Sequence, residues 1–377
     1  MPGPLKLLFV IKAMGNPGGG AERVLADVAN RLAQRGHQVS VATTERADTE
    51  PFYALDPAIS RIGLAIGSSE RPARGIETLR RMLALRKAIA RIKPDVVVGF
   101  MHSSYVPLSV AMTGLGVPLV ASEHNVPERY AGRRLQWGLL QWAARRSARV
   151  TAVSEQARAL YPAAVSRNMV VLPNPVALEA GHRANVDMPQ GRRATALAVG
   201  RLHPQKDHAT LIEAFARVAG RYPNWRLRIL GDGPLRPELE TQIARLGLAD
   251  QLELVGTVRD VSGAYQQAQL FLVPSRFESL GLSTVEAMAH GLPAIGFADC
   301  PGTNTIIADD HNGLLVDAAP QDRAGSLAEA MERLMGDTAL RKRLAANARM
   351  VGEAHDPVTV ASAWELMLDE VVRGRPG

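Results

Sequence analysis

Apolar runs of strand length alternate with amphipathic stretches of helix length along almost the whole chain. This alternation is typical of βαβ units, in which crossover helices join parallel strands. In the first half the expected strands are residues 6–13, 38–43, 95–100, 117–122, 149–153 and 169–172. In the second half they are residues 194–200, 225–231, 251–256, 268–274, 292–297 and 312–317. A chain of 377 residues with two such series predicts two α/β domains.

The series is interrupted once, at a polar stretch over 177–193 that we interpret as an interdomain linker. We therefore expect one domain over 1–180 and a second over 181–356. A helix from about Ala21 to Arg35 should end at Gly36, because glycine is favoured just after a helix C-terminus. Ligands of doubly wound sheets bind beyond the carboxyl ends of the strands, so we expect the two domains to face a cleft.

Composition narrows the class of protein. Hydrophobic residues make up 46% and charged residues 21%, which is ordinary for a soluble globular chain. The single cysteine, Cys300, excludes an intramolecular disulfide and suits the reducing cytoplasm. No apolar run approaches the roughly 20 residues that span a bilayer. Lys12 interrupts the opening KLLFVIKAM, so we interpret it as a strand and not as a signal peptide.

Positive charge is concentrated in the first half. Residues 1–190 contain 24 Lys and Arg against 14 Asp and Glu, whereas 191–377 contain 20 against 23. The excess lies in two stretches, 71–93 and 128–149, and the second also carries Trp137 and Trp142. A solvated helix face is one interpretation, and peripheral contact with an anionic membrane is another. Nucleic acid ranks last, because aromatic residues are only 5% and no nucleic-acid-binding motif is present.

Two features of the first half fall at expected strand ends. GNPGGGAER (15–23) leads directly into a helix, where glycines such as Gly19 and Gly20 would let backbone amides approach a phosphate or a sugar. A plain tight turn explains this loop equally well. His124, in ASEHN, follows the strand that ends at 122 and is a candidate site residue for that reason.

The second half carries a cationic loop and a glycine turn. GRLHPQKD (200–207) places Arg201 and Lys206 on one loop, and two such cations repel each other unless they share an anion. A diphosphate would supply that anion, and it needs neutralising most as a leaving group. LGDGP (230–234) follows the next strand, and Gly231 and Gly233 would let backbone reach a nucleotide.

The stretch FESLGLSTVEAMAHG (277–291) sets Glu278 on a loop and Glu286 inside a helix. The order S-T-V-E predicts a capping box, in which Ser283 caps the helix and Glu286 is its partner. A helix N-terminus also binds phosphate through its free amides, here those of Gly281, Leu282 and Ser283. Carboxylates on both sides of an anion site could each accept hydrogen bonds from a vicinal diol. A nucleotide-diphosphate sugar has such diols on its ribose and on its sugar ring.

Together the segments GGGAER, GRLHPQKD, LGDGPLR, FESLGLSTVEAMAHGLPAIG and NGLLV resemble the retaining glycosyltransferases of GT-B fold, family 4, over essentially the whole chain. Within that family the chain is most similar to bacterial enzymes of polysaccharide, O-antigen and lipid-linked glycan synthesis. The most specific part is the pair of glutamates eight positions apart, Glu278 and Glu286. The resemblance implies two Rossmann-like domains, an acceptor-binding one over 1–180 and a donor-binding one over 181–356.

The resemblance also implies roles for individual residues. Glu278 would contact the donor sugar, Glu286 the ribose, and His124 the transferred sugar. Arg201 and Lys206 would stabilise the leaving diphosphate. Leu282 and Ser283 would offer backbone amides, Gly19 and Gly20 would line the junction between donor and acceptor, and Val258 would face the base. The other expected donor-binding residues are Gly231, Gly233 and Gly281. A last helix, at about 357–377, would cross back onto the first domain through Trp364.

The expected reaction is transfer of a sugar with retention of configuration, from a nucleotide-diphosphate sugar that we take to be UDP-linked. Neither a cofactor nor a metal ion is expected, because cationic side chains would neutralise the diphosphate. The acceptor would be a glycan or a polyprenyl-diphosphate-linked glycan, used in cell-surface polysaccharide or lipopolysaccharide synthesis. The protein would be cytoplasmic, with peripheral contact at the inner membrane face.

Thr305 departs from the family pattern, since relatives often carry a glutamate at that position. Two rival functions stay open at this point. One is a nucleotide-sugar epimerase of related architecture, and the other is a non-catalytic scaffold subunit of a polysaccharide assembly complex.

Overall fold

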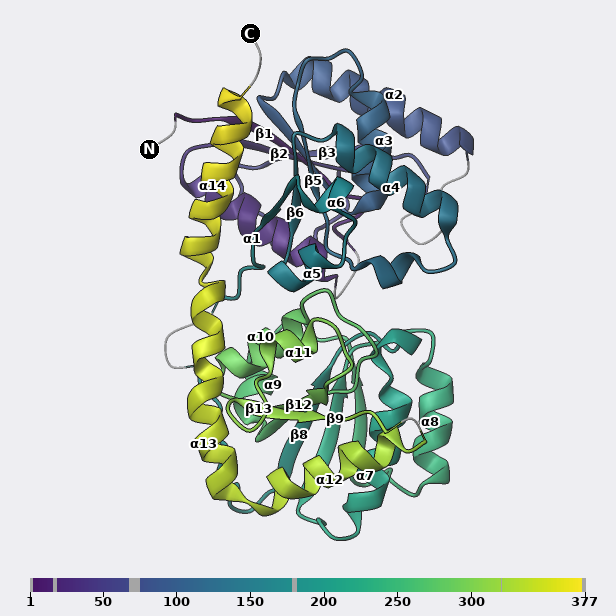
Figure 1. Cartoon of the computed structure of the whole chain (residues 1–377), viewed down its shortest axis with the longest axis vertical. Helices are drawn as coiled ribbons and strands as arrows, with labels where there is room; N and C mark the ends of the chain where they lie inside the picture. Colours follow the sequence, from purple (N-terminus) through teal and green to yellow (C-terminus); the bar gives the residue numbers. More distant parts are fainter. Residues whose placement is uncertain (1–2, 16–18, 68–74, 178–181, 320, 375–377) are drawn as a thin grey trace. The chain divides into compact units, whose positions relative to one another are not determined.

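The chain forms two compact units, each built around one parallel sheet. The structure is a computed structural model that describes residues 3–15, 19–67, 75–177, 182–319 and 321–374. Unit 1 comprises Met1–Pro175 together with Asp356–Gly377, and unit 2 comprises Val176–His355. Each unit carries its own helices and its own sheet (Figure 1).

The sheet of unit 1 has seven parallel strands in the order β3-β2-β1-β4-β5-β6-β7. The strands are β1 Lys6–Val10, β2 Gln38–Thr43, β3 Ser60–Gly63, β4 Val96–Phe100, β5 Leu119–Ser122, β6 Arg149–Ala152 and β7 Met169–Val171. The sequence prediction missed β3, because this edge strand has the sequence SRIG with its residues exposed or only half buried. The order reverses between β1 and β4, as in doubly wound folds.

Helices cover both faces of this sheet. They are α1 Gly20–Gln34, α2 Gly75–Ile92, α3 His102–Ala111, α4 Arg134–Arg146, α5 Glu155–Ala159, α6 Ala163–Ser166, α14 Pro357–Arg373 and the 3₁₀ turn η1 Pro127–Tyr130. Helix α1 ends just before Gly36, which adopts a φ of +93° as expected for the residue after a helix C-terminus.

The C-terminal helix α14 belongs to unit 1, where it packs beside α1 (Figure 1). The Trp364 ring is buried and stacks on Phe100, with ring centroids 5.9 Å apart. Glu365 binds two residues at the end of α1, with its carboxylate 2.7 Å from Arg35 Nη1 and 3.1 Å from His37 Nε2. The last helix is therefore tied to β4 and α1 by both apolar and ionic contacts.

The sheet of unit 2 has six parallel strands in the order β10-β9-β8-β11-β12-β13. The strands are β8 Ala194–Val199, β9 Trp225–Leu230, β10 Leu252–Gly256, β11 Leu270–Val273, β12 Ala294–Phe297 and β13 Gly313–Val316. Here the order reverses between β8 and β11. All six strands lie inside the runs that the sequence predicted. The central strands β8, β11 and β12 are almost wholly buried, whereas β9 and β10 combine buried residues with partly exposed or exposed ones.

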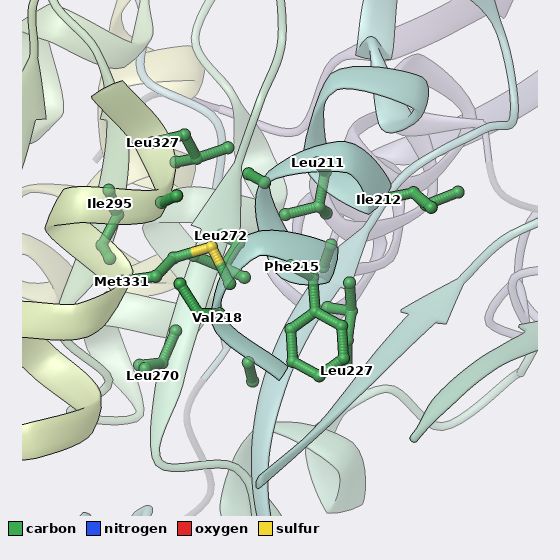
Figure 2. Close-up of a cluster of buried hydrophobic side chains, with 14 of the residues drawn as sticks. Leu211, Ile212, Phe215, Val218, Leu227, Leu270, Leu272, Ile295, Leu327 and Met331 are labelled. Atoms are coloured by element: carbon green, nitrogen blue, oxygen red, sulfur yellow. The ribbon is translucent and has the colours of Figure 1, made fainter. Parts of the chain in front are cut away.

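The helices of unit 2 are α7 His208–Ala219, α8 Arg236–Arg245, α9 Ser262–Gln267, α10 Leu282–Ala289, α11 Thr303–Ile306, α12 Arg323–Gly336 and α13 Thr338–Ala348, with 3₁₀ turns η2 Pro204–Lys206 and η3 Arg349–His355. Figure 2 shows α7 and α12 burying Phe215 and Met331 against the strands. The helical pattern over 321–350 is two helices, because Asp337 caps α13 through its side chain.

The stretch over 177–193 packs against unit 2, which contradicts its interpretation as a polar linker. Ala184 and Val186 are buried, and the Ala184 amide donates to the His290 carbonyl at 2.8 Å. Residues 178–181 of this stretch lie outside the described residues. The prediction failed because single buried residues between polar neighbours leave no periodic pattern.

Arg341 of α13 is a fully buried cation that satisfies the C-terminal end of α12. Its guanidinium donates to the carbonyls of Leu334, Met335 and Val186 and to Thr338 Oγ1 at 2.5–3.1 Å. The carbonyls of Leu334 and Met335 lie in the last turn of α12, where helix carbonyls lack an intrahelical partner.

Replacing Arg341 by alanine should therefore lower the free energy of unfolding of the protein by about 3 kcal/mol, because several buried acceptors lose their donor at once. Chemical denaturation measures the change. Arg343→Ala is the matched control, since Arg343 lies on the same helix with an exposed side chain bonded to Asp310. Equal effects of the two substitutions would contradict the proposed stabilisation.

Candidate functional site

The candidate site of unit 2 lies at the carboxyl ends of β8 and β11, the neighbouring strands between which the strand order reverses. At such a point the two following loops diverge and leave room for a ligand. The loop after β8 carries Arg201 and Lys206, and the loop after β11 carries Glu278. The topology thus brings together three of the four residues predicted to be catalytic.

Glycines hold the loop after β8 close to the loop after β9. Gly231 has a φ of +131°, and a Cβ there would lie 2.1 Å from the Gly200 carbonyl oxygen. A Cβ on Gly233 would lie 2.4 Å from the Leu202 carbonyl oxygen. The sequence analysis assigned both glycines to nucleotide binding. The structure gives them a packing reason, because only glycine permits these backbone approaches.

An ion pair couples the loops after β8 and β11. Lys206 Nζ lies 2.6 Å from Glu278 Oε1, and Ser275 Oγ donates to the same oxygen at 2.6 Å. A further bond joins the two loops, since the Gln205 side-chain amide Nε2 donates to the Phe277 carbonyl at 2.9 Å. Glu278 is only 6% exposed, so its charge depends on these two donors. The sequence did not predict Ser275 as a partner of Glu278.

Arg201 differs from Lys206 in its surroundings. Its side chain is exposed, and among the described residues it makes neither a hydrogen bond nor an ion pair. Of the two predicted diphosphate cations, Lys206 is therefore paired with Glu278, whereas the Arg201 side chain has no ion-pair partner among the described residues.

Helix α10 begins at Leu282, two residues earlier than the predicted capping box requires. Its N-cap is Gly281 in the left-handed conformation with φ +79°, and this cap makes no side-chain hydrogen bond. The capping box of Ser283 and Glu286 is therefore wrong. The first amides that bond back to Gly281 are those of Thr284 and Val285. The amides of Leu282 and Ser283 precede them and have no intrahelical acceptor, which is the arrangement that favours an anion.

Glu286 lies on α10 and is 4% exposed. Its Oε2 accepts a hydrogen bond from the Tyr265 hydroxyl at 2.9 Å. Tyr265 belongs to α9, the helix that follows β10 and the half-buried Val258. Tyr265 was not predicted as a site residue, because nothing in the sequence relates it to a glutamate on another helix.

Thr305, which replaces the family's glutamate, lies in α11. Its hydroxyl donates to the Gly302 carbonyl at 2.7 Å and thereby stabilises the local turn.

Within the described residues, no group of three or more His, Cys, Asp or Glu side chains is placed to hold a metal ion. Cys300 is buried and free.

Three predicted residues belong to unit 1. Gly19 is the N-cap of α1, and Gly20 is its first residue. A Cβ on Gly19 would lie 2.1 Å from a carboxylate oxygen of Glu22, so that acid occupies the helix N-terminus. Glu45 Oε2 accepts from the Met14 amide at 2.7 Å and thereby orders the start of the glycine loop. Residues 16–18 of this loop lie outside the described residues.

His124 follows β5 in unit 1. Its ring stacks on Phe100 at 5.3 Å, and its Nε2 lies 2.9 Å from Ser122 Oγ. Burial lowers the pKa of His124 to about 4, so the ring is neutral at physiological pH. A neutral imidazole can donate or accept a hydrogen bond but adds no positive charge.

Glu123, the residue before His124, is a buried carboxylate that the sequence analysis did not single out. It accepts hydrogen bonds from the hydroxyls of Tyr105 and Tyr130 and from the Asn125 amide. Burial raises its pKa. These hydrogen bonds hold the ASEHN turn in place, so Glu123 stabilises the backbone segment that carries His124.

Two family models match the chain. The model for glycosyl transferases group 1 covers residues 186–351, and the model for glycosyltransferase family 4 covers residues 18–180. The D-inositol 3-phosphate glycosyltransferase of Nocardiopsis dassonvillei is 31% identical over 94% of this chain and 88% of its own length. The chain belongs to the group 1 glycosyltransferases of family 4, and it is a transferase enzyme.

A second relative is an α-1,4-N-acetyl-D-galactosaminyltransferase of Campylobacter jejuni, named for a PP-undecaprenol-linked acceptor. It is 27% identical over 97% of this chain and 99% of its own length.

Solved structures support the GT-B fold. Sucrose-phosphate synthase of Thermosynechococcus elongatus matches with a TM-score of 0.84 at 21% identity, over 98% of this chain and 99% of that chain. Anabaena HepE, solved with UDP-glucose, matches with a TM-score of 0.79 at 19% identity, over 97% and 100%.

The ion pair between Lys206 and Glu278 leads to a stability prediction. Replacing Lys206 by methionine leaves a buried carboxylate with Ser275 as its remaining side-chain donor, and it should lower the free energy of unfolding by about 2 kcal/mol. Adding Glu278→Gln to that variant should restore about half of the loss, because the stranded charge is removed.

Denaturation of the single and double variants measures both effects. The matched control is Lys342→Met, which breaks an exposed pair with Asp187 at 2.7 Å in the same unit and should cost less than about 1 kcal/mol. A double variant less stable than Lys206→Met would contradict the coupling.

Proposed function

We propose that this glycosyltransferase moves a sugar from a UDP-sugar to a glycan or a polyprenyl-diphosphate-linked glycan, with retention of configuration. The observation that carries the proposal is the coupling of Lys206 and Glu278 beside the N-terminus of α10. Cation, carboxylate and free amides then lie on two adjacent loops. A diphosphate and a sugar hydroxyl are the ligand groups that need these three partners together.

The donor assignment rests on the site and on similarity. Arg201, Lys206 and the amides of Leu282 and Ser283 would hold the diphosphate, so the reaction is proposed to need neither a metal ion nor a cofactor. HepE binds UDP-glucose, which supports UDP as the nucleotide here. Glu278 would then accept hydrogen bonds from the donor sugar and fix it for attack from the side of the leaving phosphate.

The acceptor assignment rests on the C. jejuni relative, whose name specifies a PP-undecaprenol-linked glycan. We place the present enzyme in cell-surface polysaccharide or lipopolysaccharide synthesis, in the cytoplasm. This proposal distinguishes it from an epimerase, which has no acceptor, and from a scaffold, whose site residues would tolerate substitution.

Replacing Glu278 by glutamine should lower kcat by about 100-fold, because the sugar loses a charged hydrogen-bond acceptor while the residue keeps its size. Transfer from radiolabelled UDP-sugars to a polyprenyl-diphosphate glycan measures the rate, and NMR of the product gives its anomeric configuration. Glu253→Gln is the matched control, since Glu253 is exposed on β10 and paired with Arg228.

Three results would count against this function. They are an unchanged rate for Glu278→Gln, donor conversion without any acceptor, and activity that a chelator abolishes and manganese restores. An inverted product would overturn the retaining mechanism alone.

We further propose peripheral contact with an anionic membrane through the described parts of 71–93 and 128–149. Helix α3 contacts both α2 and α4, so these two helices lie on one side of unit 1 (Figure 1). Large apolar side chains are exposed at helical spacing on each: Ile76, Leu79 and Leu83 on α2, and Leu135, Leu139 and Trp142 on α4. Exposed arginines flank them, among them Arg80 and Arg134.

Two of the arginines on α2 are hydrogen-bonded to backbone carbonyls of neighbouring segments. Arg86 donates to the carbonyls of Ala111 and Thr113 at 2.8 Å, and Arg81 donates to the Ile66 carbonyl, so these two arginines also stabilise the fold.

The two tryptophans of α4 differ in their surroundings. Trp137 packs on Tyr130, whereas Trp142 lies on the surface and stacks with the Arg146 guanidinium. Arg71 and Arg74 lie outside the described residues. None of the described helices has the length and apolar content to span a bilayer.

The double substitution Leu135→Ser and Trp142→Ser should reduce binding to phosphatidylglycerol vesicles roughly tenfold, because two apolar side chains no longer enter the interface. Flotation at low and high salt measures binding, which should weaken with salt. Leu366→Ser, on the exposed face of α14, is the control. Salt-insensitive binding, or an equal loss in the control, would contradict the surface.

A further inference from the structure

Helix α9 holds Glu286 of helix α10 by two separate routes. The first acts on the side chain, where the Tyr265 hydroxyl donates to Glu286 Oε2 at 2.9 Å. Tyr265 is 1% exposed, and its ring packs on Phe271 and on His290, with centroids 6.0 and 5.0 Å away. The position of the hydroxyl is therefore fixed by the packing of its ring, and it fixes the carboxylate in turn.

The second route acts on the backbone of Glu286. His290 Nδ1 lies 2.8 Å from the Glu286 carbonyl oxygen, and His290 Nε2 lies 2.9 Å from Ser262 Oγ. His182 Nδ1 approaches the same hydroxyl at 3.1 Å. Ser262 is the first residue of α9, so the helix that carries Tyr265 also anchors this chain of hydrogen bonds.

The Glu286 carbonyl at the end of this hydrogen-bonded series determines which His290 nitrogen is the donor. A carbonyl only accepts, so Nδ1 of His290 carries the proton and donates to Glu286, while Nε2 of the same ring is joined to the Ser262 hydroxyl. The Ser262 hydroxyl also lies within hydrogen-bond distance of His182. Rotation of the His290 ring would break two bonds at once. The arrangement holds the middle of α10 at a set distance from α9.

We infer that Tyr265 and Ser262 are positioning residues that set Glu286 for recognition of the donor ribose, and that Tyr265 thereby controls selectivity for the ribose hydroxyls. This inference rests on the proposed function, because it takes the ligand of unit 2 to be a nucleotide-diphosphate sugar. A carboxylate can bind a vicinal diol with both oxygens only in one orientation. In that site a glutamate free to rotate would spend part of its time turned away from the ribose.

The alternative is that Tyr265 only satisfies a buried carboxylate and contributes stability. The two roles differ in one measurable respect. A positioning role affects ligands that carry the ribose hydroxyls and leaves those without them alone, whereas a structural role affects both kinds of ligand equally. The probes are UDP and 2′,3′-dideoxy-UDP, with the corresponding GDP and ADP pairs as parallel arms.

Calorimetric titration of Tyr265→Phe tests the inference, because this substitution removes one oxygen and keeps the packed ring. We expect UDP to bind roughly tenfold more weakly, the loss of one hydrogen bond to a charged group. Binding of 2′,3′-dideoxy-UDP should stay within about twofold of the native value. Tyr222→Phe is the matched control, since its hydroxyl donates to the Glu332 carbonyl at 3.3 Å in the same unit.

Two further variants complete the test. Glu286→Gln should also abolish the preference for UDP, and the double variant Tyr265→Phe with Glu286→Gln should be no weaker than Glu286→Gln, because both act through one carboxylate. Ser262→Ala should reduce the preference about threefold through the backbone route. It replaces Tyr265→Phe if a thermal melt shows that variant to be unfolded.

The outcomes distinguish failure of this inference from failure of the proposed function. An unchanged ratio of the two affinities in Tyr265→Phe, with Glu286→Gln altered, would overturn the positioning role and leave the proposed function intact. A native enzyme that binds UDP and dideoxy-UDP equally would remove the ribose contact but not donor binding. A native enzyme that binds none of the nucleotides would overturn the proposed function and this inference with it.

Discussion

The parallel sheet is the constraint on which both units depend. Parallel strands need crossover connections, and because all the strands of such a sheet point the same way, every loop that follows a strand lies at the same edge of the sheet. In unit 2 the loops after β8, β9, β10 and β11 therefore gather at one edge, although the ends of β8 (Val199) and β11 (Val273) are 74 residues apart in sequence. The candidate site is a consequence of this geometry more than of any single motif.

Much of the fold follows from the sequence because the strands are buried on both faces. Strands β11 and β12 of unit 2 are apolar runs whose residues are all buried, as in a sheet that is covered on both faces. Strands β9 and β10, on one side of the sheet, keep an apolar pattern but also carry Arg228 and Glu253. The two segments that the sequence did not predict are those with few or no buried residues. Strand β3, at the edge of its sheet and only partly covered, carries polar residues and was missed. Buried Ala184 and Val186 were missed because their neighbours are polar.

The candidate site was predictable in its parts but not in its connections. Lys206, Glu278 and Glu286 stand in recognisable segments, yet their partners Ser275 and Tyr265 follow from packing between separate elements. Helix α10 shows the limit most clearly. Ser283 and Glu286 match the pattern of a capping box, but Gly281 adopts a left-handed conformation and starts the helix two residues earlier. Only the backbone conformation, which the pattern does not encode, decides between them.

The pairing of Lys206 with Glu278 also has a consequence for the order of events at the site. Under the proposed function, an incoming diphosphate would compete with Glu278 for Lys206, whereas exposed Arg201 has no such competitor among the described residues. Arg201 and the α10 amides would then make the first contact with the anion, before Lys206 responds. As charge grew on the leaving diphosphate, Lys206 would be drawn toward it, and Glu278 would be released to accept from the sugar. The ion pair of the free protein would in that case become two separate interactions in the transition state, where interactions contribute most to the rate.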